Sequence, residues 1–460
     1  MTASPRTVVL VEREGEDSLR VKLDKAPALF DGAKVGHLLD CDPDTMPPWT
    51  DPRAVEAHGL TLSSKLAAAH PAIRQALEDL LRAPAHQRRP LYFHIQADEA
   101  ERFWWEALFD SKKGFLALDA RWPIARMADF GVDSATIHAF APPLKLMALL
   151  SALNRDAEPE WRRLYEAVEG ARANGLPVEV MLLVGKRELF QTLSAEAQAG
   201  QLPGVTVRPV PDRSADLAAL LESFAPHILH FFCHGTVALG RSGLELATFA
   251  DWLRNDGRSS LVVDVDALMG FPSMQDVWLV TLNCCDGGKS VERLHSMAYR
   301  LVANGLPTAV GMLEPVDASD AHEFCGFFYV AAFDAIRKAV DSVKAAGNGA
   351  TAEVQWVEAL FPSRTALREK HPQDPADNRR WVLPVLYVRP DPFQIRLLQP
   401  AAPPPEELKS MKSRAEMVAG TLRVLPPETP PDVRQRLLDL LADLPPELRP
   451  DASGAFPSGG

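Results

Sequence analysis

The sequence predicts an α/β protein built on a mainly parallel sheet flanked by helices on both faces. From about residue 142 onward, short apolar segments alternate with longer segments of helical periodicity. Some of the apolar segments, such as VMLLV at 180–184 and VLPVLYV at 382–388, have no polar interruption. Such runs are typical of strands buried on both faces of a parallel sheet. In sheets of this kind, ligands and reactive groups lie at the carboxyl ends of the strands.

Length and composition indicate a globular protein with more than one structural unit. The chain has 460 residues, of which 47% are apolar and 24% are charged. No apolar run approaches the roughly 18 residues of a membrane span, and the N-terminus lacks the apolar core of a signal peptide. The formal net charge of −12 argues against nucleic-acid binding, which needs clustered Lys and Arg.

The cysteines do not form the pattern of a disulfide framework. Their number is odd and their spacing is irregular: Cys41, Cys233, Cys284, Cys285 and Cys325. A reducing compartment is therefore expected, and we predict a cytoplasmic protein that does not bind membranes.

We expect three regions along the chain. An N-terminal α+β region covers 1–135, the central α/β domain covers 136–398, and a Pro-rich tail covers 399–460. In the first region, the hydrophobic pattern predicts strands at 7–14, 18–26 and 90–97 and an amphipathic helix at 70–83.

The central region supplies the predicted sheet. Its expected strands cover 143–153, 178–185, 205–210, 227–235, 277–285, 308–316 and 382–390. The main helices expected between them cover 159–175, 186–200, 214–225, 291–305 and 317–340. A longer polar insertion separates the fourth of these strands from the fifth.

The composition changes again in the tail. Eleven of the 39 prolines fall in the last 60 residues, which predicts an extended and semi-rigid segment. Between two proline clusters, residues 432–444 have the spacing of one amphipathic helix. That helix would dock on its own domain or on a partner, and the extreme C-terminus is expected to be disordered.

Two of the expected strands end in reactive side chains. One runs to Cys233 and His234 before Gly235, and the other runs to Cys284 and Cys285. A nucleophilic thiol needs a base that keeps it as thiolate, and imidazole is the usual base. Two parallel strand ends would present both groups at one edge of the sheet. We therefore predict that His234 and Cys285 form a catalytic pair.

The spacing of this pair fits the caspase signature, Gln-Ala-Cys-[Arg/Gln/Gly]-Gly with a histidine about 50 residues upstream. Here the string is NCCDG, and His234 lies 51 residues before Cys285. Neighbouring strand residues face opposite ways, so Cys284 is expected to point toward the core. The amides of Gly235 and Cys285 are expected to bind the oxyanion, because glycine lets the substrate backbone approach closely.

Several motifs in the same order resemble the CHAT branch of the caspase-like peptidases, which is found in many bacteria. The segments that carry the resemblance are FWWEALFDSKKGFLALD at 103–119, HFFCHG at 230–235, LNCCDGG at 282–288 and GMLEPVDASDAHEFCGFFY at 311–329. It extends over roughly residues 100–395. Asn283 and Cys284 depart from the usual Ser-Ala pair, and Gly287 replaces the usual Thr.

The resemblance implies a caspase-like fold and a regulated cysteine endopeptidase that needs no metal or organic cofactor. It also implies a dedicated protein substrate and an activating protein partner, in a bacterial defence or cell-death system. The N-terminal region and the Pro-rich tail would then hold the site inactive until a partner or signal binds.

Three further residues are candidates for substrate binding. Relatives with basic specificity carry an Asp two residues before the nucleophile, where this chain has the neutral Asn283. Asp286 and Asp317 are candidate pocket carboxylates that would favour Arg or Lys, and helix capping is an equally good interpretation of both. His230 and His322 are expected to be structural.

Three other functions are compatible with parts of the pattern. The string NCCDGGKS at 283–290 resembles the end of a phosphate-binding loop, but its first glycine is missing. Cys233, His234, Cys284 and Cys285 offer zinc ligands, but adjacent pairs do not match zinc-site spacing. The third alternative is a catalytically silent scaffold that binds other proteins.

Overall fold

A computed structural model describes residues 6–14, 19–27, 35–39, 52–97, 100–101, 103–129, 135–238, 241–254, 259–283, 294–314, 316–370, 379–398 and 405–426. The chain divides into two compact units, Met1–Leu398 and Gln399–Gly460. In the second unit the described element is helix α11 (Pro405–Val424). None of the helices in the described ranges is long and apolar enough to span a membrane.

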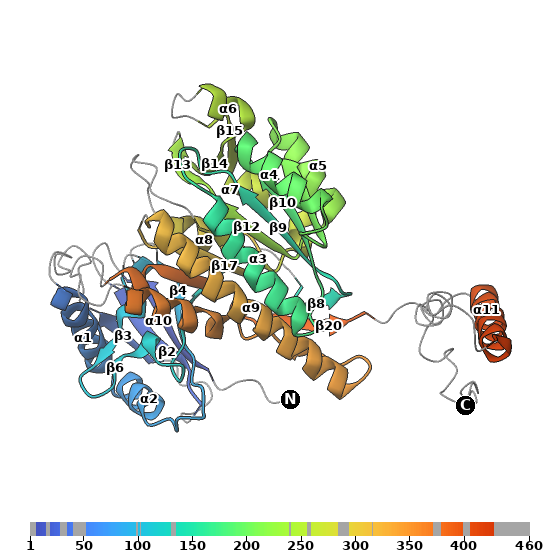
Figure 1. The fold of residues 1–460 in the computed structure, drawn as a ribbon. Coiled ribbons are helices and arrows are strands. Elements are labelled where there is room, and N and C mark those ends of the chain that lie inside the picture. The colour runs from blue at the N-terminus through green and yellow to red at the C-terminus, as the bar shows by residue number, and fades with distance from the viewer. Residues whose placement is uncertain are drawn as a thin grey trace. The chain divides into compact units, whose positions relative to one another are not determined.

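The larger unit is built on one twisted sheet, which has twelve strands among the described residues (Figure 1). In spatial order these are β11 (Val205–Pro209), β10 (Val178–Val184), β9 (Leu144–Leu150), β12 (Ile228–Phe232), β16 (Leu279–Leu282), β17 (Thr308–Met312), β19 (Pro384–Val388), β7 (Ile124–Ala128), β4 (Leu91–Ile95), β1 (Thr7–Arg13), β2 (Leu19–Lys25) and β3 (Val35–Leu39). The predicted α/β class with a mainly parallel sheet is confirmed.

The sheet contains two parallel blocks that run in opposite directions. The first block extends from β11 to β17, and all of its neighbouring pairs are parallel. β17 and β19 are antiparallel, and β19, β7, β4 and β1 then run parallel to one another. The boundary that we expected near residue 135 therefore does not interrupt the sheet. Strands from both sides of it belong to one hydrogen-bonded unit.

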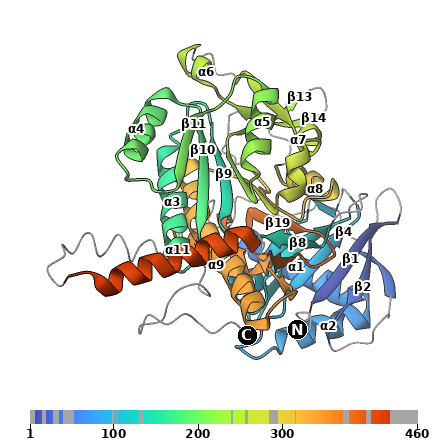
Figure 2. The ribbon, with the colours of Figure 1, turned by 90° about the vertical axis from the view of Figure 1, so that its right-hand side faces the viewer.

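Helices cover both faces of the sheet, as the sequence predicted. In the view of Figure 2, α3, α4 and α9 lie on one side of the first block, and α5, α7 and α8 lie on the other. The helices are α1 (Pro52–Ala69), α2 (Pro71–Leu81), α3 (Glu158–Ala173), α4 (Arg187–Gln198), α5 (Ser214–Phe224), α6 (Phe249–Arg254), α7 (Val265–Met269), α8 (Leu294–Ala303), α9 (Ala318–Ala346) and α10 (Leu360–Lys370).

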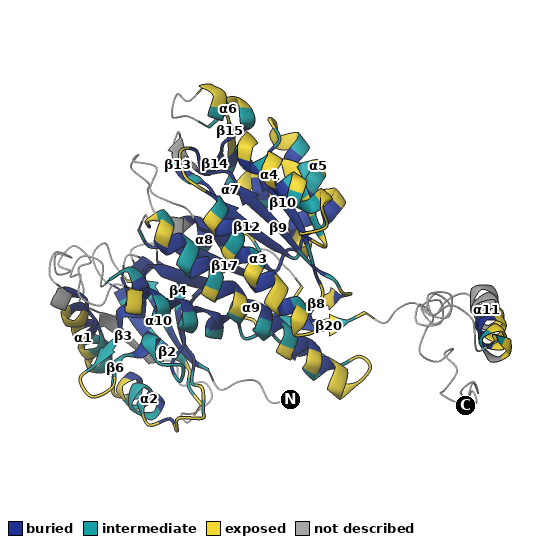
Figure 3. Ribbon diagram, viewed as in Figure 1, coloured by how far each residue is buried: buried dark blue, intermediate teal, exposed yellow. Residues whose placement is uncertain are grey.

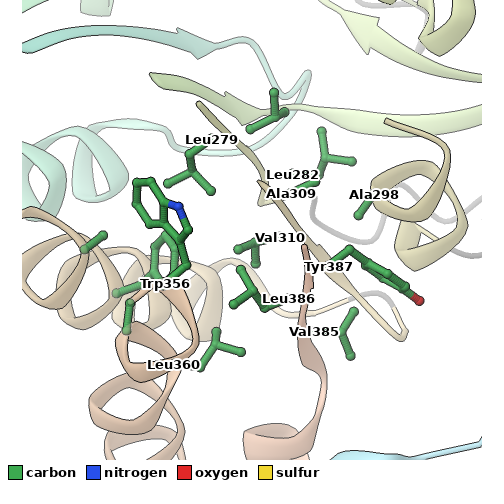
Figure 4. Packing of buried hydrophobic residues seen from close by; sticks show 14 of the residues in the cluster. Leu279, Leu282, Ala298, Ala309, Val310, Trp356, Leu360, Val385, Leu386 and Tyr387 are labelled. Atoms are coloured by element: carbon green, nitrogen blue, oxygen red, sulfur yellow. The ribbon is translucent and has the colours of Figure 1, made fainter. Parts of the chain in front are cut away.

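The central strands are buried on both faces, as Figure 3 shows by colour. Leu386 and Tyr387 are neighbours in β19 and point to opposite faces, so each packs against a different layer (Figure 4). On one of those sides the strands meet Trp356 and Leu360. This two-sided burial explains why the strands consist of nearly continuous apolar runs.

Two segments differ from the expectation. The strand that was predicted to continue through His234 ends at Phe232, and His234 begins a separate hairpin strand, β13 (His234–Ala238). β13 pairs with β14 (Arg241–Leu246), which pairs with β15 (Leu261–Asp264). The polar insertion therefore forms a small three-stranded sheet.

The described residues form two further small sheets. One contains β18 (Ala352–Glu353), β20 (Gln394–Leu397) and β8 (Ile137–Phe140), and the other contains β5 (Phe109–Asp110) and β6 (Gly114–Phe115).

The tail differs as well, because α11 occupies a part that was expected to be extended. No proline interrupts residues 406–425, and Pro405 lies at the first position of the helix, where its missing N–H is tolerated. The predicted helix at 432–444 lies outside the described residues.

A buried ion pair ties the N-terminal block to the segment that follows β4. The Arg126 guanidinium donates to both carboxylate oxygens of Glu106, at 2.9 and 2.7 Å, and to the carbonyls of Glu101 and Phe103. Both charged side chains are fully buried. Neither charge has access to water, so each depends on the other for stabilisation.

We expect Arg126→Met to destabilise the larger unit by about 3–5 kcal/mol, because it leaves the Glu106 carboxylate buried without its counter-charge. Urea unfolding measures the change. The double variant R126M/E106Q should recover part of the loss, whereas Arg82→Met, in an exposed ion pair with Glu78, should change stability by less than about 1 kcal/mol. Equal stability of R126M and the wild type would contradict this role.

The stability of the larger unit should depend on pH through His227. Burial, with the charges of Lys145 and His138, lowers the pKa of His227 from 6.5 to about 4, and its Nδ1 accepts the Lys145 backbone N–H at 3.0 Å. The unfolded chain therefore binds a proton at His227 at higher pH than the folded chain does. Its contribution to stability is complete above pH 6.5 and is lost as the pH falls toward 4.

In His227→Asn, whose side-chain oxygen replaces the acceptor, the free energy of unfolding should depend less steeply on pH between 6.5 and 4. The slope should fall by up to about 1.4 kcal/mol per pH unit, which corresponds to one proton. Denaturant titrations over this range measure the slope, and exposed His86→Asn is the control. An unchanged slope in the His227 variant would rule out this assignment.

Candidate active site at the strand ends

The predicted catalytic pair follows two neighbouring parallel strands. β12 pairs with β16 in a constant register, from Ile228 opposite Leu279 to Phe231 opposite Leu282. Each pair is separated by 51 positions, and the same number separates His234 from Cys285 in the sequence. The backbone N–H of Asn283 continues the pairing by donating to the carbonyl of Phe231 at 2.9 Å. Cys285 lies outside the described residues.

The His234 imidazole is held by the end of the next strand. Its Nε2 lies 2.7 Å from the carbonyl oxygen of Leu153, which follows β9. A carbonyl oxygen only accepts, so Nε2 carries the hydrogen, and in the neutral ring the basic nitrogen is Nδ1. The side chain is partly buried. His234 is therefore oriented by a third group, as general bases in nucleophilic catalysis usually are.

Backbone bonds join the loops that surround His234. Ser151 donates its N–H to the Phe232 carbonyl at 2.8 Å and its hydroxyl to the Ala247 carbonyl at 2.8 Å. A Cβ at Gly185 would lie 2.2 Å from that same Ala247 oxygen, so only glycine fits there. Gly235, a predicted oxyanion donor, is buried in β13 opposite Leu244.

Asn283, a predicted substrate contact, is fully buried. Its amide nitrogen donates to Oε1 of Glu160 at 2.5 Å and to the carbonyl of Ala321 at 2.8 Å. The side chain thus connects the end of β16 to helices α3 and α9. Both hydrogens of this amide are used inside the protein.

Glu160 is the centre of a buried polar cluster that the sequence reasoning missed. Besides Asn283, its carboxylate meets His230 Nε2 at 3.0 Å, His322 Nδ1 at 2.7 Å and the Cys325 thiol. We call these five residues the Glu160 cluster. One signal was present in the sequence, because Glu160 lies on the inward apolar stripe of α3, together with Leu164, Ala167, Val168 and Ala171.

The cluster holds a negative charge in the interior. Burial raises the pKa of Glu160, but the hydrogen bonds from His230 and His322 outweigh burial and keep the pKa below its ordinary value. Burial, with the Glu160 charge, raises the pKa of the Cys325 thiol well above its ordinary value. Cys325 is therefore an unreactive thiol. The Tyr329 hydroxyl extends the cluster, because it lies 3.2 Å from His230 Nδ1 and donates to Thr281 at 3.0 Å.

Glu160, His230 and Cys325 also offer donor atoms that lie within 4.8 Å of one another, a set that suits zinc. Asn283, His230, His322 and Cys325 already occupy the oxygens of the Glu160 carboxylate, and the thiol is protonated. We therefore interpret the cluster as a hydrogen-bonded one. Of the zinc ligands considered from the sequence, Cys233 is fully buried, and Cys284 and Cys285 lie outside the described residues.

The remaining predicted residues lie elsewhere. Asp317 occupies the N-cap position of α9, but its carboxylate pairs with Arg380, which also binds Asp320. Asp286 lies outside the described residues. A groove of about 660 Å³ runs along the C-terminal half of α9, beside Lys338 and Glu358, and none of the predicted site residues is among those that line it.

The described part of the site is a histidine held at the end of a parallel block of strands, next to the strand that leads to the two cysteines. Comparison with known protein families matches residues 64–346 to the CHAT domain. The match covers more than half of the chain, so this protein belongs to the CHAT family. The resemblance stated from the sequence is confirmed.

Other comparisons are more distant. Among solved structures, the separase–securin complex of Saccharomyces cerevisiae is similar, with 11% sequence identity and a TM-score of 0.28. The alignment covers 68% of this chain and 16% of that one. A search among curated proteins finds no match.

The contact with Leu153 predicts the tautomer of His234. In its neutral form the ring should carry hydrogen on Nε2, and nitrogen-15 NMR of histidine-labelled protein reports this directly. His227 is an internal reference, because its Nδ1 accepts a backbone N–H and its neutral ring must have the same tautomer. A neutral His234 with hydrogen on Nδ1 would contradict the orientation described above.

Proposed function

We propose that this protein is a cysteine endopeptidase in which Cys285 is the nucleophile and His234 is its general base. The observation that carries the proposal is the His234–Leu153 contact, which leaves Nδ1 as the basic nitrogen at the strand ends. The register of β12 and β16 supports the pairing, because the offset of 51 is also the separation of His234 from Cys285. Neighbouring strands lie about 4.8 Å apart, a distance that two side chains bridge.

The proposed reaction is acyl transfer. His234 Nδ1 takes the proton of the Cys285 thiol, and the thiolate sulfur forms a bond with the scissile carbonyl carbon. The amides of Gly235 and Cys285 hold the resulting oxyanion. The tetrahedral species collapses, the C–N bond breaks, and His234 returns the proton to the leaving amine. Water then attacks the thioester and releases the acid and the free thiol.

Family membership supports a wider proposal about the role of the protein. We propose a regulated cytoplasmic protease that cleaves a dedicated protein in a bacterial defence or cell-death system, under the control of an activating protein partner. Asn283, Asp286 and Asp317 stay candidates for substrate selection. Since Asn283 is buried and bonded to Glu160, it would act on substrate only through the backbone that it holds.

Thiol labelling tests the pair without a known substrate. At mildly acidic pH, a limiting dose of iodoacetamide should modify Cys285 before the other cysteines, and mass spectrometry maps the modified site. His234→Ala should slow this labelling by roughly tenfold or more, because the thiol loses its base. The control is His94→Ala, since His94 lies on β4 in the second parallel block. Buried Cys233 and Cys325 serve as internal references.

Cys285→Ala should abolish cleavage of the natural substrate and leave the fold intact. Slow and uniform labelling of the wild type that persists with candidate partners would contradict the protease and favour a silent scaffold. Cleavage by the Cys285→Ala variant would exclude Cys285 as the nucleophile.

A further inference from the structure

We propose that Glu160 is a positioning residue for the dyad, because its buried carboxylate contacts β12 and the end of β16, the two strands that lead to His234 and Cys285. The inference rests on the proposed function of that dyad and adds a residue from a distant helix to it. Glu160 lies 74 positions before His234 and 125 positions before Cys285. Nothing in the local sequence around the dyad points to it.

One carboxylate connects four elements. Glu160 projects from the first turn of α3, where it meets His230 of β12 and Asn283 at the end of β16. It also meets His322 and Cys325 of α9, the long helix that lies beside α3 (Figure 1). β12 and β16 are thereby tied to α3 and α9 on one face of the sheet.

The strength of these contacts follows from charge and burial. Glu160 is fully buried, and its donors keep its pKa below the ordinary value, so it is a carboxylate at neutral pH. Hydrogen bonds to an ionised group are shorter and roughly twice as strong as bonds between neutral groups. A neutral amide at residue 160 would also replace one acceptor oxygen by an NH₂ group, which cannot accept hydrogen bonds from the surrounding donors. The positions of His230, Asn283 and His322 therefore depend on the charge at residue 160.

The effect reaches Cys285 through the chain. Asn283 precedes Cys285 by two residues, and two residues span at most about 7 Å. The Asn283 side chain is bonded to Glu160, and its backbone N–H is bonded to Phe231 in β12. If Asn283 moves, the segment that carries the thiol moves relative to the segment that carries His234. A displacement of about 1 Å at a reacting centre lowers a rate by about a hundredfold.

The test compares three variants by the pH profile of Cys285 alkylation. Glu160→Gln keeps the length of the side chain but removes the charge, and Asn283→Ala removes only the last link to β16. Glu158→Gln is the control, because Glu158 lies on the same helix and pairs with Arg162 in an exposed position. Hydrogen exchange of residues 279–283 is measured in parallel, since it reports anchoring of β16 whether or not the enzyme is active.

We expect E160Q and N283A to slow Cys285 alkylation at mildly acidic pH by about tenfold or more, and to move the midpoint of the profile to higher pH. Exchange at 279–283 should become faster, and E158Q should match the wild type. The direction of the midpoint separates two causes. Loss of a nearby anion by itself favours a thiolate and lowers the midpoint, whereas loss of the histidine partner raises it.

Two outcomes would overturn the proposal: a wild-type profile in folded E160Q and N283A, or a midpoint that moves to lower pH. If E160Q does not fold, N283A decides alone, because it leaves Glu160 with its two histidines. An ordinary thiol profile in the wild type would count against the dyad itself. In that case the hydrogen exchange of residues 279–283 decides the anchoring role of Glu160. Exchange in E160Q and N283A that equals the wild-type rate would overturn this role, and faster exchange in the variants would support it.

Discussion

Parallel pairing of β12 with β16 determines which residues of two distant segments arrive together at the edge of the sheet. The pairing covers four consecutive residues of β16, and the backbone bond from Asn283 to Phe231 extends it beyond the last strand residue. Both strands are buried on both faces, so a slip of one residue would reverse every side chain between two packed layers. His230 would then lose Glu160, and Thr281 would lose Tyr329.

Polar contacts fix the positions of the side chains that the strand register brings to the edge of the sheet. His234 is held by a carbonyl from the neighbouring strand end, and Asn283 is held by a carboxylate from a helix below the sheet. Desolvation of the polar groups offsets part of the stability that each contact contributes. Their value is geometric, since a buried polar network with several mutual contacts admits few arrangements. The same reasoning applies to Arg126 and Glu106 in the other half of the sheet.

Much of the fold was predictable from hydrophobic pattern. β9, β10, β16 and β19 consist mainly of apolar residues, and the helices between the strands of the first block follow the 3.6-residue period. The antiparallel step between β17 and β19 was not predictable, because periodicity carries no information on strand order. The hairpin strand β13 was missed because its first residues, His234 and Gly235, follow the apolar run of β12 directly and look like the end of that strand. In the tail, overall proline content obscured a stretch without proline that forms α11.

The candidate site was predictable to a different extent. His234 was a candidate from the sequence, because a polar residue before glycine at the end of an apolar run is conspicuous. Its Leu153 partner was not, because a backbone carbonyl has no signature. Glu160 is the instructive case: the stripe of α3 shows that it faces inward, but its partners lie between 70 and 165 positions further along the chain. Only the packing of α3 and α9 against the sheet brings them together.

Because β17 and β19 are antiparallel, the two parallel blocks have their carboxyl strand ends at opposite ends of the sheet. The carboxyl ends of β9, β12 and β16 open at one end of the larger unit, and those of β4 and β7 open at the opposite end, where His94 and Gln96 bind Asp129. Loops at the two ends can therefore lengthen and diverge independently during evolution, while they share one hydrogen-bonded core. Proteins with this sheet can therefore differ in the loops at one end while the loops at the other end stay the same.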